Sequence, residues 1–192
     1  MKFKSSVATL LVLSLCAACA VLAAAIRGAP QISQPKAVDL SGLTVIGIQA
    51  RTSYARESGP QGVIGPQWTK FMTEGWLNKI PNRADRNMMA VYTDYENEYK
   101  GQYTFVVGAK VKADTAVPSG MIAVKVPAGH YAMFTTDTGP VQQILPTAWR
   151  AIWALPKSSL GGDRTYKTDF EVYDQRAMNP QNSQVDIYIG IK

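Results

Sequence analysis

The sequence predicts an α+β fold in which an antiparallel sheet carries two main helices on one face. Three observations lead to this prediction. Segments with apolar residues at alternating positions recur along the chain, two longer segments have apolar residues at helical spacing, and both kinds of segment occur twice in a similar order. With 192 residues, the chain has room for one or two compact domains and a sizeable core.

The first segment has the layout of a secretory signal. Met1-Lys2-Phe3-Lys4 is basic, and residues 7–26 contain no charged side chain. Three alanines at residues 23–25 provide a cleavage point, so we expect cleavage after Ala25 and export of the remainder. An apolar run of this length also suffices to span a bilayer, which makes an uncleaved anchor the alternative. The protein is therefore expected to be secreted or periplasmic, or anchored to a membrane through residues 7–26.

Both cysteines, Cys16 and Cys19, fall in that first segment. Cys19 follows two alanines, as a lipidated cysteine does, but Cys16 stands where such a signal has leucine, so lipidation is the weaker expectation. Cleavage after Ala25 would leave a mature chain without cysteine. Its stability is then expected to come from packing and not from disulfides.

Charge and composition argue against several classes of function. The formal net charge is +6, and the basic residues are scattered and do not form a stripe on one element, which disfavours nucleic-acid binding. A single histidine and the missing cysteines disfavour a metal centre, and we expect neither metal nor cofactor.

The remaining chain divides into a linker and a duplicated domain. Residues 26–42 are polar with two prolines and predict a flexible linker. The domain is expected at residues 43–192, with repeats at about 43–112 and 120–192. The first repeat is predicted to contain strand, helix, strand and strand at residues 43–50, 66–80, 88–95 and 103–111. The second is predicted to contain two strands, a helix and two strands at residues 121–126, 130–135, 145–155, 170–174 and 185–192.

The two predicted helices each carry an apolar stripe with tryptophans in it. Trp68 and Trp76 lie on the first stripe and Trp149 on the second, whereas Trp153 lies off its centre. Core packing is the ordinary interpretation of such residues, but this many aromatic side chains leaves some to line a cavity. Prolines at 66 and 146 suit the first turn of a helix, where the missing N–H is not needed.

Residues 168–174 carry the main candidate for a binding group. In a strand, Phe170 and Val172 point to one side, and Asp169, Glu171 and Tyr173 point to the other. On this pattern alone, Glu171 is interpreted as a solvated residue of a half-exposed strand. The repeat register that overlays Tyr92 on Tyr173 places Glu171 opposite Ala90. The duplicated unit is therefore expected to hold one carboxylate.

Four stretches together resemble the GyrI-like small-molecule-binding family, which also supplies the effector-binding domain of multidrug-responsive regulators of the AraC and MerR types. They are Val-Pro-Ala-Gly-His-Tyr-Ala-Met-Phe at 126–134, Thr-Ala-Trp-Arg-Ala-Ile-Trp at 147–153, Thr-Asp-Phe-Glu-Val-Tyr-Asp at 168–174, and Val-Asp-Ile-Tyr-Ile-Gly-Ile-Lys at 185–192. The first half, at 90–95 and 103–108, matches more loosely.

The resemblance implies two pseudo-symmetric halves that form one antiparallel sheet, with a groove between them for a hydrophobic, often cationic ligand. The family glutamate matches Glu171. The ligand-binding candidates are Glu171, Tyr173, Tyr92, Trp68, Trp149 and Tyr131. The chain departs from the regulators because an export signal, and no helix-turn-helix region, precedes the domain. Transcription control is therefore not expected. The partner that the resemblance implies is a small hydrophobic or cationic molecule, and a monomer is favoured.

Two other functions stay open from the sequence. Some stand-alone members of the family are hydrolases of reactive cyclopropane-containing toxins, and here Glu171 would act as base or orient water, with Tyr92 or Tyr173 as proton donor. No catalytic residue is assigned on this basis. The weaker alternative is haem binding, through the lone His130, because the haem-binding SOUL proteins share a related duplicated fold; a histidine in a turn is the ordinary interpretation.

Overall fold

A computed structural model of the chain describes residues 32–98 and 100–192. The predicted export signal and its cleavage point lie outside the described residues. Within the described part of the chain, no helix has both the length and the apolar character needed to cross a membrane.

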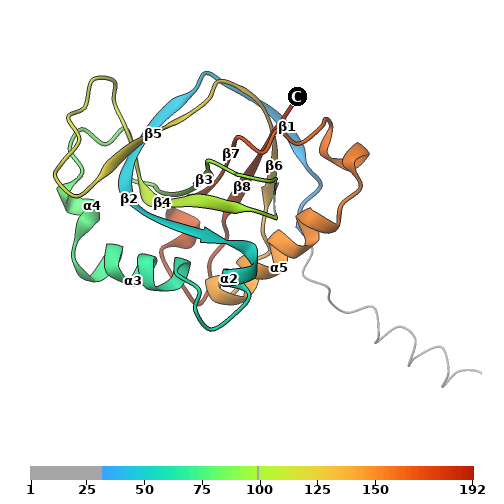
Figure 1. The fold of residues 1–192 in the computed structure, drawn as a ribbon, viewed down its shortest axis with the longest axis horizontal. Helices are drawn as coiled ribbons and strands as arrows, with labels where there is room; N and C mark the ends of the chain where they lie inside the picture. The colour runs from blue at the N-terminus through green and yellow to red at the C-terminus, as the bar shows by residue number, and fades with distance from the viewer. Residues whose placement is uncertain (1–31, 99) are drawn as a thin grey trace, which may run out of the picture.

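An antiparallel sheet of eight strands organises the described chain (Figure 1). Its order is β1-β6-β8-β7-β3-β4-β2-β5, and every neighbouring pair is antiparallel. The strands are β1 Lys36–Leu40, β2 Leu43–Ser53, β3 Met88–Thr93, β4 Gln102–Val111, β5 Ile122–Val126, β6 Gly129–Thr135, β7 Thr168–Tyr173 and β8 Asp186–Ile191. The predicted α+β class is confirmed.

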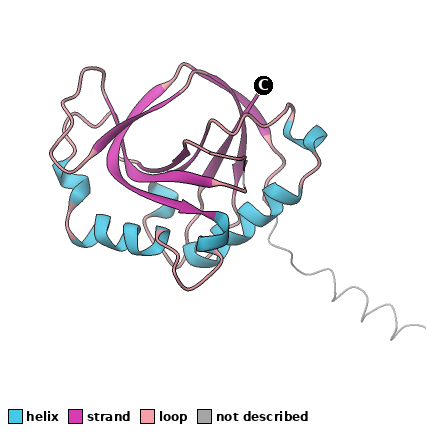
Figure 2. Cartoon of the chain, viewed as in Figure 1, coloured by secondary structure: helices cyan, strands magenta, loops and turns pink. Residues whose placement is uncertain are grey.

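The helices α2, α3 and α5 lie together along one side of the strongly curved sheet (Figure 2). The described helices are α2 Tyr54–Glu57, α3 Ile64–Thr73, α4 Trp76–Lys79 and α5 Val141–Ala154, with 3-10 turns at Lys157–Leu160 and Gln175–Ala177. The single helix predicted at 66–80 is two helices, because Gly75 adopts the left-handed backbone conformation (φ 66°) between them.

The second main helix begins earlier than residue 145. The carbonyl of Pro140 accepts the N–H groups of Gln143 and Ile144, so the first turn closes at residue 140. Pro146 consequently lies inside α5, and its predicted place in the first turn is wrong. Pro66, by contrast, lies in the first turn of α3.

The sheet order is symmetric about its centre and shows how the two repeats combine. The strands β7 and β3 form the central pair. Equivalent strands of the two halves lie at equal distances in the order on either side of it: β8 and β4, then β6 and β2, then β1 and β5. The first strand of each repeat pairs with the second strand of the opposite repeat, since β1 pairs with β6 and β5 with β2. The duplicated unit therefore has four strands, and its first strand is exchanged between the halves.

Strand β1 corrects the predicted linker at 26–42. Residues 36–40 are part of the sheet, with Ala37 paired to Ala132, and the apolar side chains of Val38 and Leu40 pack against the core. The short strand completes the edge of β6, which would otherwise expose unpaired backbone groups. The polar, proline-containing composition did not reveal this role.

The symmetry axis passes close to Glu171. Strands β3 and β7 pair so that Ala90 faces Glu171, and the same two residues are equivalent in the register that overlays Tyr92 on Tyr173. Two residues that are both paired and equivalent lie on the pseudo-twofold axis. The fold therefore presents one carboxylate at its centre of symmetry.

Apolar side chains cover both faces of the sheet. The helix side holds the larger cluster, which includes Phe71, Phe105 and Trp149. The other side holds a smaller cluster, in which Phe170 stacks on Tyr188 with 4.4 Å between ring centroids. Successive side chains of β7 therefore point into one or the other of two apolar clusters, and neither face of this strand is open to solvent.

Candidate ligand-binding site

Glu171 lies on the helix side of β7 and is buried, with 1% of its surface exposed. Its neighbours in sequence, Phe170 and Val172, belong to the cluster on the opposite face, as the alternation predicts. The interpretation of Glu171 as a solvated strand residue is wrong, because the helices cover this face of the sheet.

Three neutral groups donate hydrogen bonds to the Glu171 carboxylate. Oε1 accepts from the Tyr92 hydroxyl at 2.9 Å and from Trp149 Nε1 at 2.5 Å, and Oε2 accepts from the Tyr173 hydroxyl at 2.6 Å. The donors come from β3, α5 and β7, so both halves contribute. No Lys or Arg among the described residues forms an ion pair with this carboxylate.

The environment of Glu171 works against its charge. Burial raises the pKa of its carboxyl group, while the hydrogen bonds from Tyr173, Trp149 and Tyr92 act in the opposite direction. The effect of burial is the larger, so the pKa of Glu171 lies above its ordinary value. Burial and the nearby carboxylate also raise the pKa of Tyr92 and Tyr173, so both phenols stay protonated and donate.

Aromatic rings enclose the carboxylate. The Trp149 ring packs against Tyr92 at 5.1 Å between centroids, and Tyr92 packs against Phe105 at 5.4 Å. On the other side Trp68 contacts the Tyr173 ring at 4.8 Å. Aromatic side chains from both halves therefore separate the Glu171 carboxylate from solvent.

An outer aromatic pair lies between the two halves. Tyr54 of α2 and Trp153 of α5 meet edge to face at 4.7 Å, and Trp153 also contacts the ring of Trp149. Tyr54 is 41% exposed and Trp153 is 37% exposed. These two side chains link solvent to the buried carboxylate through a continuous series of aromatic contacts.

Five of the six predicted ligand-binding residues lie together. Glu171, Tyr92, Tyr173 and Trp149 are joined by hydrogen bonds, and Trp68 is joined through the ring of Tyr173. Tyr131 lies apart. It belongs to the cluster on the opposite face of the sheet, where its hydroxyl donates to the Pro127 carbonyl at 3.0 Å.

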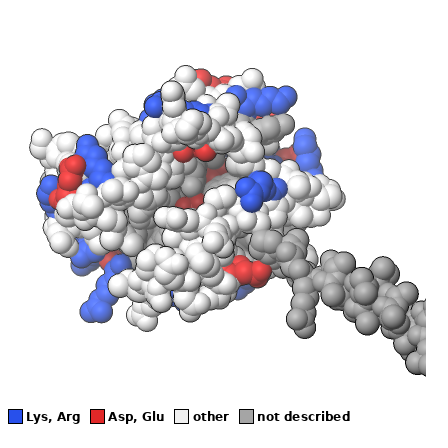
Figure 3. Space-filling view, turned by 90° about the horizontal axis from the view of Figure 1, so that it is seen from below, with Lys and Arg blue, Asp and Glu red and all other residues white. Residues whose placement is uncertain are grey.

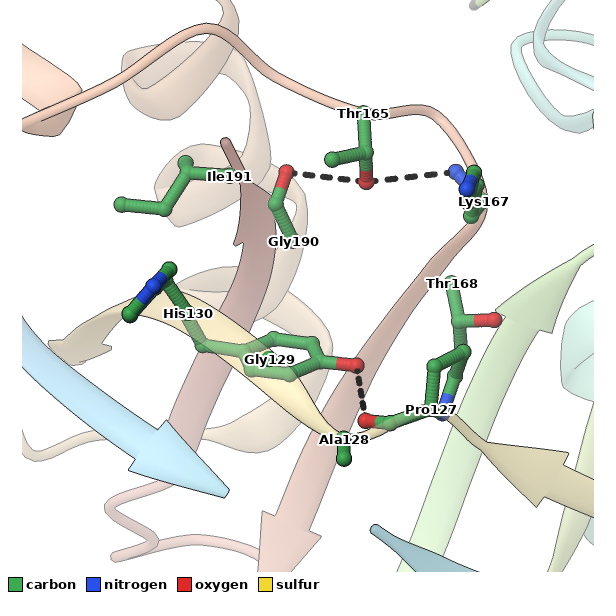
Figure 4. A pocket seen from close by; sticks show the side chains of 10 residues that line it. Pro127, Ala128, Gly129, His130, Thr165, Lys167, Thr168, Gly190 and Ile191 are labelled. Carbon is green, nitrogen blue, oxygen red and sulfur yellow. Dashed lines mark hydrogen bonds between the residues drawn. The ribbon is translucent and has the colours of Figure 1, made fainter. Parts of the chain in front are cut away.

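His130 is exposed at the start of β6, where its Nδ1 contacts the carboxylate of Asp39. It borders a shallow pocket of about 200 Å³ together with Thr165, Lys167 and Gly190 (Figure 4). Small-molecule sites generally exceed about 300 Å³. The surroundings of His130 therefore do not support haem binding. Among the described residues, no group of three potential metal ligands lies together.

Sequence reasoning missed a second buried carboxylate with its partner. Asp169 is fully buried and accepts hydrogen bonds from Arg164 at 2.5 Å, from the Tyr95 hydroxyl at 2.8 Å and from the Gly190 N–H at 3.0 Å. The alternation on β7 placed Asp169 on the same side as Glu171 and was a usable signal. Arg164 lies in a loop without periodicity, so no pattern pointed to it.

In this structure, groups of the protein itself occupy the carboxylate oxygens of Glu171. A general base must reach a water molecule or a substrate proton. The oxygens of Glu171 instead accept from three protein donors inside an aromatic enclosure. Such an anion suits the recognition of a positive charge.

Comparison with known proteins identifies the family. The model of a family described as "Cass2: Integron-associated effector binding protein" matches residues 37–191. The chain belongs to the GyrI-like effector-binding family. The match begins inside β1, so the family domain starts before residue 43. The chain therefore contains a small-molecule effector-binding domain.

Individual relatives agree with the GyrI-like assignment. The YobU protein of Bacillus subtilis (strain 168) is 36% identical over 148 residues, which covers 76% of this chain and 90% of YobU. An integron cassette protein from the mobile metagenome of Vibrio cholerae has the same fold, with a TM-score of 0.65, 24% identity, and coverage of 86% of this chain and 100% of that one.

A second solved structure with the same fold is that of SAV2435 bound to tetraphenylphosphonium. It superposes with a TM-score of 0.67 at 16% identity and covers 83% of this chain and 94% of SAV2435. At such identity the likeness concerns the fold.

Proposed function

We propose that this chain is an exported protein that binds one lipophilic cation at Glu171. One observation carries the proposal: a fully buried carboxylate, surrounded by aromatic rings, is held by three neutral donors and pairs with no cation in the described part of the chain. A buried charge without a counter-charge is unfavourable, even when it is hydrogen-bonded.

A delocalised cation would satisfy this site in two ways. It would supply the missing counter-charge, and its contact with each aromatic face would contribute about 0.5–2 kcal/mol. Trp149 and Tyr92 present rings on one side of the carboxylate and Trp68 and Tyr173 on the other. Tetraphenylphosphonium, which SAV2435 holds in the same fold, is a cation of this class and supports the proposal.

Entry to the site would require the outer aromatic pair to separate. Tyr54 and Trp153 are partly exposed and contact each other across the two halves, so their displacement breaks few contacts. The side of the molecule that carries the helices is shown in Figure 3. Acidic atoms are visible within the recess near its centre, whereas most basic side chains lie toward the edges, an arrangement that favours the approach of a cation.

Binding is tested with a charged and a neutral ligand of similar shape. We expect tetraphenylphosphonium to bind the chain lacking residues 1–25 at least tenfold more tightly than triphenylphosphine oxide, because only the former pairs with Glu171. Tryptophan fluorescence reports the difference, since Trp149 Nε1 donates directly to the carboxylate. Equal affinities for the two compounds, or no response to either, would refute the proposal.

Export is tested by following the chain in the cell that makes it. The basic start and the uncharged residues 7–26 support cleavage after Ala25, so mass spectrometry of the exported fraction should find a chain that begins at Ile26. A variant without residues 2–25 should stay inside the cell. Recovery of the intact chain from membranes would instead support the anchor, and its recovery from the cytoplasm would contradict export.

A further inference from the structure

A second carboxylate lies two residues from Glu171 on the same strand. Asp169 and Glu171 both project to the helix side of β7, and neither is exposed to a significant extent. Alternate residues of a strand are about 7 Å apart, so two ionised groups at this spacing would form a strongly negative buried site.

Asp169 is already paired with a cation from the chain. Nη2 of Arg164 donates to its Oδ2, and the Arg164 side chain is only 8% exposed. The guanidinium lies over the ring of Tyr166 at 4.7 Å and near the ring of Trp149 at 6.0 Å. Within the described residues, the buried Nε of Arg164 has no hydrogen-bond partner, so contact with the rings and the carboxylate holds it in place.

The two carboxylates therefore have related surroundings but differ in whether a cation accompanies them. Each is bonded by tyrosine hydroxyls and bordered by aromatic rings, and Trp149 is shared, with its Nε1 on Glu171 and its ring beside Arg164. Asp169 has Arg164 as its cation, whereas no Lys or Arg of the described residues pairs with Glu171. A further acid, Glu57, is partly exposed and accepts the N–H groups of Val63 and Ile64 at the start of α3.

We propose that Arg164 determines the charge selectivity of the site. By neutralising Asp169, it leaves Glu171 as the one buried carboxylate among the described residues without a cation, so the site takes a monocation and discriminates against a dication. This inference rests on the proposed binding of cations at Glu171. A second positive group on the ligand would have to displace a guanidinium that the chain itself holds beside Asp169, at high effective concentration.

The test compares two ligands that differ by one positive charge. Butyltriphenylphosphonium is the monocation, and the same molecule with a trimethylammonium group at the end of the butyl chain is the dication. We expect the wild-type protein to prefer the monocation. Arg164→Met should shift the affinity ratio toward the dication by about tenfold, because Asp169 then lacks its partner. Arg164→Lys, which keeps the charge, should retain the wild-type ratio.

A double variant separates charge from shape. Arg164→Met combined with Asp169→Asn removes both charges and should return the ratio to the wild-type value. An unchanged ratio in a folded Arg164→Met protein, or an equal shift in the double variant, would overturn the selectivity proposal. Circular dichroism establishes folding in each case.

The single variant Asp169→Asn keeps the proposal testable if Arg164→Met does not fold. It leaves Arg164 to offset Glu171, so the affinity for the monocation should fall about tenfold, and an unchanged affinity would contradict the proposal. If the wild-type protein binds neither ligand, the proposed function fails. If it binds both with a ratio that Arg164 does not influence, only the present inference fails.

Discussion

Glu171→Gln is expected to lower the affinity for lipophilic cations by about a hundredfold and, at the same time, to stabilise the ligand-free protein. Two opposite charges about 5 Å apart attract by roughly 3 kcal/mol at an effective dielectric constant of about 20, which corresponds to the loss in affinity. The amide keeps the size of the side chain. Its oxygen still accepts from Tyr92 and Trp149, and its NH₂ donates to the Tyr173 hydroxyl once that hydroxyl turns.

The gain in stability follows from the raised pKa of Glu171, which is caused by burial. The folded state then holds the proton to a higher pH than the unfolded state does. The free energy of unfolding of the wild-type protein should therefore fall as the pH rises from about 4.5 through the raised pKa. Glu171→Gln has no such proton to lose, so its advantage should be largest at neutral pH and should shrink near pH 4.

The pH also changes binding in the wild-type protein. Cation affinity should fall as the pH is lowered through the pKa of Glu171, because a protonated carboxyl group offers no counter-charge. Titration calorimetry at several pH values measures this loss, and thermal unfolding measures the stability.

Glu74→Gln is the matched control for this prediction. Glu74 also accepts a hydrogen bond from a tryptophan, Trp76 Nε1 at 3.0 Å, but it is exposed at the end of α3. Its substitution should change neither affinity nor stability by more than about 0.5 kcal/mol. A Glu171→Gln protein with wild-type affinity would show that the ligand does not use this carboxylate.

Gly108→Ala is expected to lower the free energy of unfolding by about 3 kcal/mol or more. Gly108 of β4 pairs with Gly47 of β2, and the two strands approach so closely here that an added Cβ would lie 2.1 Å from the Ile46 carbonyl oxygen. The obstacle is backbone within the sheet and cannot turn aside as a flexible side chain could. The strands must separate, which disturbs the buried neighbours Val107 and Ala109 in the core beneath the helices.

Gly65→Ala is the same substitution at a site where we expect the free energy of unfolding to rise. Gly65 lies in the first turn of α3, and an added Cβ there would meet no atom within 4 Å. Alanine in a helix is favoured over glycine by up to about 1 kcal/mol, so this variant should be slightly more stable than wild type. Urea unfolding followed by tryptophan fluorescence compares both variants. A wild-type midpoint for Gly108→Ala would mean that the sheet relaxes freely at this pair.

Local patterns in the sequence were sufficient for the features that depend on period and order. Alternation at residues 168–174 placed Phe170 and Glu171 on opposite faces, and the recurrence of similar segments predicted the duplication that the symmetric sheet order shows. Family motifs in the second half identified the GyrI-like domain, which the family match confirms. These features are encoded by neighbours in the chain, since a strand has a period of two wherever it lies.

Packing between distant segments decided the rest. The exchange of β1 and β5 between the halves and the packing of Tyr131 on the far face depend on segments that are distant in the sequence. At the start of α5, the N–H of Val141 likewise donates to the carbonyl of Pro180. The same holds for the environment of Glu171. Its burial is produced by Tyr92, 79 residues away, and by Trp149, 22 residues away.

The neighbouring charge is also a product of the tertiary structure. Arg164 reaches Asp169 from an irregular loop, and the shared ring of Trp149 comes from α5. Sequence identified the carboxylate that could bind a cation. Only folding removed it from water, surrounded it with aromatic rings and neutralised the adjacent acid, because desolvation and ion pairing depend on which groups meet in space.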